Sequence, residues 1–282
     1  MRTCYDFPIY TFPDVRCRLL EARLQETLEV DTSRLLDLAF ITNKYKYLTT
    51  ERWATDLLVR HCSDGEGRAD FAKSCTQEQL EALIDISIRT ERPDLRIAAE
   101  QRWLTRLQAG TLSTTFALDV GERFRLRSFL GHVYYMHLIF LCTPKTDSLP
   151  VVGSAVKLDI GDLHDIHVQR LQSGFLSLCL TWDAIVNMPF SVGVDYHCPY
   201  HGYTHREKRL SHWWEKLIVD STVTFLSSSM DVLGRLKLIY GKLNKDRGHW
   251  HCYHDLFTHL DRLQATVESE LPNHFGIVYN DR

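Results

Sequence analysis

The sequence predicts a mainly α-helical protein, and three observations lead to that prediction. Apolar residues recur at the spacing of one helix face along nearly the whole chain. Residues that favour helix starts and ends flank these segments, and strand-like alternation is scarce. The chain has 282 residues, of which 44% are hydrophobic and 11% aromatic. It is therefore long enough to bury the core of one large domain or of two modest ones.

Residues 31–62 are expected to form a helical hairpin. Asp31, Thr32 or Ser33 can cap the first helix, whose apolar stripe is Leu35, Leu38, Ala39 and Ile41. Thr49 or Thr50 can cap the second helix, which carries on one face Trp53, Leu57 and Leu58. We expect Trp53 to be substantially buried against Leu35, Leu38 and Tyr45.

The middle of the chain predicts further helices after a loop over residues 63–71, which is rich in glycine and charge. Helix-like apolar spacing covers residues 76–90, 92–110 and 111–140. Pro93 fits the first turn of its helix and Gly110 fits the exit. These helices are expected to pack as antiparallel hairpins.

The clearest break in the chain is residues 143–156, which contain two prolines and a glycine. Beyond it, amphipathic helices are predicted over residues 163–186, 206–220, 227–243 and 254–272. In the second of these, one of the adjacent residues Trp213 and Trp214 is expected to pack in the core.

Composition argues against several classes of partner. Lys plus Arg number 33 against 36 Asp plus Glu, and the net charge of −3 gives no electrostatic footprint for nucleic acid. The longest apolar stretch, residues 129–142, is too short to span a bilayer, and no signal peptide is visible. The cysteines are spread over a long chain, as in proteins that keep them reduced. We expect a cytoplasmic or nuclear protein that binds neither nucleic acid nor membrane.

Motifs of common catalytic classes are absent from the sequence, including Gly-x-Ser-x-Gly, His-Glu-x-x-His and the dinucleotide glycine fingerprint. His164 and His167 have one-turn spacing, but no third metal ligand is evident nearby, so we interpret them as part of a partly exposed helix face. The sequence therefore predicts a protein that is not an enzyme.

Two clusters rich in histidine and cysteine, "HCPYHGYTH" and "HWHCYH", suggest a metal site. Cys198 and His201 form a C-x-x-H pair, and His249 and Cys252 form an H-x-x-C pair. Two such pairs can complete a tetrahedral Cys₂His₂ site that binds one structural zinc ion.

Two alternatives stay open for these clusters. His251 or His254 can replace His249, because a small shift of the following helix changes which imidazole faces Cys198. The histidines can also serve only to cap helices, stack and contact solvent, with each cysteine a small buried residue.

Residues 30–58 resemble the C-terminal helices of the BTB/POZ fold, in particular those of the BTB proteins numerous in mushroom-forming fungi. In that group a Leu-Leu-x-x-Ala helix is followed by Lys-Tyr and then by a helix with Trp-Ala. The matching residues are Leu35, Leu36, Ala39, Lys44, Tyr45, Trp53 and Ala54.

The resemblance covers most of residues 25–278. A later motif, Leu-x-x-Leu-x-Gly-x-Ala-Tyr-Tyr, is matched by Leu126, Phe129, Gly131, Tyr134 and Tyr135, with Val133 in place of the alanine. The C-terminal third matches in the Cys/His pairs, the helix at Trp213, "DVLGRL" at residues 231–236 and "ELPNHFGI" at residues 270–277.

The resemblance implies three parts. Residues 1–62 are expected to be the C-terminal part of a BTB/POZ-like domain, residues 63–142 a helical extension, and residues 157–282 a C-terminal helical region with the candidate zinc-binding pairs. A complete BTB domain begins with strands and a helical hairpin, and we expect this chain to lack that N-terminal half.

The resemblance also implies a non-enzymatic protein that binds other proteins, similar to adaptors that bring a partner to a cullin-type ubiquitin ligase. A cullin is thus one expected partner. The alternative is a zinc-dependent enzyme or a zinc-stabilised nucleic-acid-binding protein that uses the histidine-rich clusters, although the net negative charge argues against nucleic acid.

Overall fold

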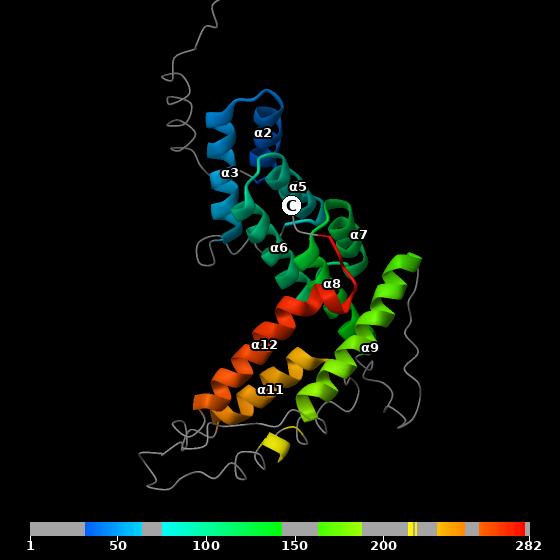
Figure 1. Ribbon diagram of the computed structural model, residues 1–282. Coiled ribbons are helices and arrows are strands. Elements are labelled where there is room, and N and C mark those ends of the chain that lie inside the picture. Colours follow the sequence, from blue (N-terminus) through cyan, green and yellow to red (C-terminus); the bar gives the residue numbers. More distant parts are fainter. Residues whose placement is uncertain are drawn as a thin grey trace, which may run out of the picture. The chain divides into compact units, whose positions relative to one another are not determined.

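The computed structural model (Figure 1) describes residues 32–63, 75–142, 163–187, 214–216, 218, 230–245 and 254–279. These residues form α-helices and contain no strand, which confirms the prediction of a mainly α-helical protein. None of the described helices is both long and apolar enough to cross a membrane. The chain divides into two compact units, Met1–Trp103 and Leu104–Arg282, and the boundary falls within one helix.

The first unit contains α2 (Thr32–Lys44), α3 (Leu48–Ser63), α5 (Gln77–Arg89) and most of α6 (Pro93–Gln108). Helix α2 packs against both α3 and α5. Thr76 caps α5 in a capping box with Gln79, where each side chain bonds to the backbone of the other residue. Pro93 begins α6, and Gly110 follows its end with φ +66°, as predicted.

The predicted hairpin of α2 and α3 is present, and three residues of its expected apolar stripes, Leu35, Ala39 and Leu58, lie in the core. Leu35 and Ala39 of α2 and Ala54 and Leu58 of α3 are each 0% exposed. Helix α3 therefore presents its Ala54–Leu58 face to the core.

Trp53 is only half-buried, and Tyr45 is 61% exposed. Of the three residues expected to bury Trp53, Leu35 lies in the core and Leu38 is half-buried, whereas Tyr45 lies largely in solvent, so the expected part of Tyr45 is wrong. Ile41, which was expected in the apolar stripe, is 53% exposed. The stripe instead ends in Thr42, whose buried hydroxyl donates to the carbonyls of Leu38 and Ala39.

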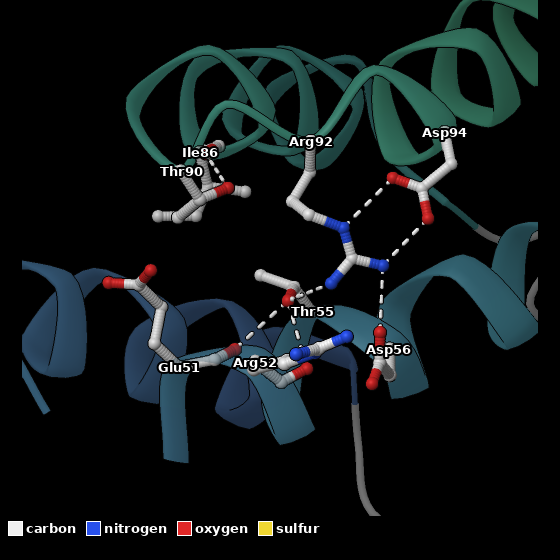
Figure 2. A network of polar contacts seen from close by, with 8 residues as sticks. All are labelled: Glu51, Arg52, Thr55, Asp56, Ile86, Thr90, Arg92 and Asp94. Carbon is white, nitrogen blue, oxygen red and sulfur yellow. Dashed lines mark hydrogen bonds and ion pairs between the residues drawn. The ribbon is translucent and has the colours of Figure 1, made fainter. Parts of the chain in front are cut away.

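Arg92 connects α3 with the start of α6 (Figure 2). Its Nη2 lies 2.7 Å from Asp56 Oδ1 and 2.6 Å from Asp94 Oδ2, and its Nη1 donates to Thr55 Oγ1 at 3.0 Å. The hydrogen bonds that Arg92 donates to Asp94 above all, and then to Asp56, raise the pKa of Arg92 against the opposing effect of burial. This guanidinium therefore holds two helices of the first unit in register.

The second unit contains α7 (Thr114–Phe124), α8 (Arg127–Cys142), α9 (Asp165–Asn187), α11 (Val232–Lys245) and α12 (His254–His274). Helix α8 is central, because it packs against α7, α9 and α12. Helices α11 and α12 lie side by side (Figure 1). The expected helical segment over residues 111–140 is two helices, because Arg125 adopts the left-handed conformation with φ 56° and ends α7.

Two glycines allow helices to cross closely in this unit. A Cβ at Gly131 of α8 would lie 2.8 Å from the backbone nitrogen of Pro272 in α12. A Cβ at Gly174 of α9 would collide with the ring of Phe275. Because proline lacks an N–H group, Pro272 leaves no donor to satisfy at this crossing.

Candidate interaction site

The predicted zinc ligands Cys198, His201, His249 and Cys252 lie outside the described residues, as does His251. The zinc site therefore stays a prediction. Within the described ranges of the chain, no group of three or more His, Cys, Asp or Glu side chains could hold a metal ion.

His164, just before α9, and His167, in its first turn, differ in burial. His164 is exposed, whereas His167 is 3% exposed and its Nδ1 lies 2.6 Å from the hydroxyl of Tyr134. Nε2 of His167 lies 3.4 Å from Asp119 Oδ1, and burial lowers the pKa of His167. The expectation of a partly exposed face holds for His164 alone, since His167 bonds α9 to α8.

Tyr135 and Asp231 form a buried polar pair at the start of α11. The Tyr135 hydroxyl donates to Asp231 Oδ1 at 2.6 Å and accepts from the backbone N–H of Leu233 at 3.0 Å. The same carboxylate oxygen accepts from the N–H of Gly234 at 2.9 Å. Burial, and then the charge of Asp231, raise the pKa of Tyr135, so its hydroxyl keeps the proton that it donates. Together the two side chains satisfy backbone donors at the N-terminus of α11.

Residues of the motif at 126–135 and of the segment 270–277 also contact each other around α8. The rings of Tyr134 and Phe275 stack with centroids 5.2 Å apart. Arg127 donates to the carbonyl of Ile277 at 3.1 Å and to the side chain of Asn273. Together with the Gly131–Pro272 crossing and the Tyr135–Asp231 pair, these contacts bring the segments 126–135, 231–236 and 270–277 into one core.

A pocket of about 750 Å³ adjoins the Tyr135–Asp231 pair, and we call it the α8 pocket. Most of its apolar lining comes from the end of α6, the α6–α7 connection and α8, and Leu233 of α11 adds to it. The residues of the first three parts are Leu104, Leu107, Leu112, Met136, Ile139 and Phe140. Phe140 is 70% exposed although it is a large apolar side chain. The pocket thus offers uncovered apolar surface inside a concave site.

Charged and polar groups of both signs complete the lining of the α8 pocket. Asp231 and Glu268 contribute carboxylates, and Lys237 and His132 contribute basic groups. His132 is oriented by its Nδ1, which donates to the carbonyl of Ser128 at 2.9 Å. Such an arrangement can bind an apolar group and orient the polar atoms beside it.

Sequence reasoning missed this pocket, although α8 carries a signal for it. Residues 129–142 are apolar on nearly every face of the helix, and a helix that is apolar all round needs cover on all sides. Neighbouring helices cover the face of Tyr134 and Leu138, which are 0% exposed. They leave the face of Met136 and Phe140 partly open.

Comparison of the chain with protein-family models, with curated proteins and with solved structures found no match.

Proposed function

We propose that this chain is a non-enzymatic protein that binds other proteins, and that its α8 pocket receives an apolar segment of a partner. The observation that carries the proposal is the concave apolar lining of the pocket with Phe140 70% exposed. Open apolar surface of this kind on a folded protein commonly marks an interaction site. A volume of about 750 Å³ lies within the range of pockets that enclose a bound group.

Two polar groups beside the pocket, the hydroxyl of Tyr135 and the carboxylate of Asp231, favour a binding role for the pocket over a catalytic one. A catalytic carboxylate or hydroxyl must be able to exchange a proton with the reacting group. Here the Tyr135 hydroxyl and Asp231 Oδ1 bond to each other and to the first amides of α11. Their bonds stabilise the fold, and the apolar walls are left for a ligand.

Peptide selection on the immobilised full-length chain tests the proposal. Peptides that bind the wild type should lose affinity by about tenfold or more with Phe140→Ser, because a buried aromatic anchor typically contributes more than ~1 kcal/mol. Leu176→Ser is the matched control, since Leu176 is 61% exposed on α9 and does not line the pocket. Equal loss of binding in both variants, or none in either, would contradict the proposal.

The family resemblance extends the proposal to an adaptor related to BTB/POZ proteins that serve cullin-type ubiquitin ligases. Its support is the motif match over residues 30–58 and the later segments. We expect an immobilised cullin to retain the full-length chain. A cullin that retains neither this chain nor a version extended upstream would remove the ligase part and leave the pocket proposal in place.

A further inference from the structure

The turn between α2 and α3 in the first unit carries large apolar side chains that the fold leaves in solvent. Ile41, Tyr45, Tyr47 and Leu48 are 53%, 61%, 63% and 68% exposed. Tyr45 lies one helical turn after Ile41, because its N–H bonds to the carbonyl of Ile41 at 3.0 Å. We call residues 41–48, which include these four side chains, the hairpin tip.

The backbone of the hairpin tip is held in one shape. Lys46 has φ 60°, and its N–H bonds to the carbonyl of Asn43 at 3.2 Å while that of Tyr47 bonds to Thr42 at 2.9 Å. This pair of bonds is the Schellman motif that ends many helices. The side chain of Asn43 braces the turn by donating to Glu51 at 3.0 Å. A fixed turn with exposed tyrosines presents contact area at low entropic cost.

These side chains do not belong to the buried core of the hairpin, which includes Leu35, Ala39, Ala54 and Leu58. The exposure of the hairpin tip is therefore not explained by hairpin packing. Tyrosine is among the residues most enriched at interface hot spots.

The charge of the tip indicates the chemistry of its partner. Lys44 and Lys46 are exposed within the tip, and residues 41–50 contain no Asp or Glu. The Lys44 ammonium lies 5.5 Å from the ring centroid of Tyr45. The first carboxylate along the chain after the tip, that of Glu51, accepts the hydrogen bond from Asn43. An apolar centre with a basic rim complements apolar side chains flanked by carboxylates.

We propose that the hairpin tip is a second docking surface, distinct from the α8 pocket, which binds an acidic helical segment of a partner protein. Apolar side chains of that segment contact Tyr45, Tyr47 and Leu48, and its Asp or Glu residues face Lys44 and Lys46.

Fluorescence anisotropy on the full-length chain tests this docking surface. The probes are synthetic helical peptides with Leu and Phe on one face and Glu on the other, and a matched set with Lys in place of Glu. We expect the acidic set to bind, with affinity that falls as salt rises. The double variant Tyr45→Ser/Tyr47→Ser and the variant Lys44→Glu/Lys46→Glu should each weaken binding by about tenfold or more.

Ile97→Ser is the matched control, because Ile97 is 49% exposed on α6 in the same unit, and it should leave binding unchanged. Phe140→Ser should also leave it unchanged, which separates this surface from the α8 pocket. Absence of binding, equal binding of acidic and basic peptides, or binding that survives the tyrosine variant would overturn the proposal. Binding of anionic lipid vesicles that the tyrosine variant abolishes, without peptide binding, would assign the tip to a membrane surface instead.

Discussion

Buried polar groups contribute to the stability of the second unit, and the hydroxyl of Tyr135 is the clearest example. A buried hydroxyl or carboxylate destabilises the fold unless hydrogen bonds replace those to water. Tyr135 is 6% and Asp231 8% exposed, and each satisfies the other. The same hydroxyl also satisfies the amide of Leu233.

Tyr135→Phe should therefore destabilise the protein by about 1–3 kcal/mol, because it removes one of the hydrogen bonds to the buried carboxylate of Asp231 and leaves the buried amide of Leu233 without the hydroxyl that accepts from it. Urea unfolding followed by circular dichroism measures this change. Tyr240→Phe is the control in the same unit, because Tyr240 is only half-buried, and it should change stability less. A smaller effect for Tyr135→Phe than for the control would show that water replaces the lost hydroxyl.

The tryptophans of the first unit differ in burial, and their substitutions should differ accordingly. Trp103 is 0% exposed, whereas Trp53 is half-buried. Trp103→Ala should destabilise the protein by about 3–5 kcal/mol through lost burial and a new cavity. Trp53→Ala should cost clearly less, and thermal unfolding of both variants compares them. The opposite order would mean that α3 packs through its Trp53 face.

Several of the described helices end in the same way, at a residue with left-handed backbone conformation. The helices α2, α5, α6, α7 and α12 each end in a left-handed residue, and these residues are Lys46, Glu91, Gly110, Arg125 and Gly276. After α7, the N–H of Leu126 bonds to Gly121 at 2.9 Å and that of Arg125 to Glu122 at 3.2 Å, which is the Schellman pattern. The non-glycine residues adopt this conformation at a conformational cost.

Arg125→Gly should stabilise the second unit by up to about 1 kcal/mol, since glycine removes the steric cost of the left-handed conformation but adds chain entropy to the unfolded state. Gly276→Ala is the matched test of opposite sign. A Cβ at Gly276 meets no atom within 4 Å, so only its φ of 65° opposes alanine. Chemical unfolding of both variants gives the two changes, and equal signs would contradict the argument.

Protonation of buried histidines should control the acid stability of the second unit. Burial, with a smaller contribution from neighbouring His167, lowers the pKa of His137 to about 4. Nδ1 of His137 lies 2.6 Å from the hydroxyl of Thr114, while Nε2 is buried without a hydrogen-bond partner. Burial also lowers the pKa of His167, His259 and His274.

The folded protein should therefore lose stability as the pH falls from about 6.5 toward about 4, because the unfolded chain binds protons that the buried imidazoles exclude. His137 alone should account for about 2–3 kcal/mol over this range. Urea unfolding at several pH values measures the slope. His137→Gln should flatten it, and an unchanged slope in this variant would show that other groups dominate.

The predicted zinc ion concerns the C-terminal region. If Cys198, His201, His249 and Cys252 bind it, the purified chain should contain zinc, and Cys198→Ser and Cys252→Ser should each lose it. Chelation should loosen the C-terminal helices more than the α2–α3 hairpin, as hydrogen exchange would detect. Cys62→Ser, at a buried cysteine outside both clusters, is the control that should keep the metal. Zinc retained in both cluster variants would contradict the ligand assignment.

Local sequence predicted most helices and several of their ends. Thr76, Pro93 and Gly110 mark helix boundaries through the chemistry of their own backbone and side chains, which acts over a few residues. The apolar spacing predicted a core residue in the Trp213–Trp214 pair, and Trp214 is 4% exposed. Among the motif residues of the family resemblance, Gly131 and Tyr134 pack against Pro272 and Phe275, whereas Lys44 and Tyr45 are exposed.

Tertiary packing decided which apolar face each helix buries and where it leaves one open. Periodicity placed Trp53 and Ile41 on core faces, but in the fold Trp53 is half-buried and Ile41 is 53% exposed. Tyr135 and Asp231 are 96 residues apart in sequence, and only the fold brings them together beside the α8 pocket. Caps and periodicity depend on neighbours along the chain, whereas a pocket, a buried pair and an exposed tip depend on segments that meet only after folding.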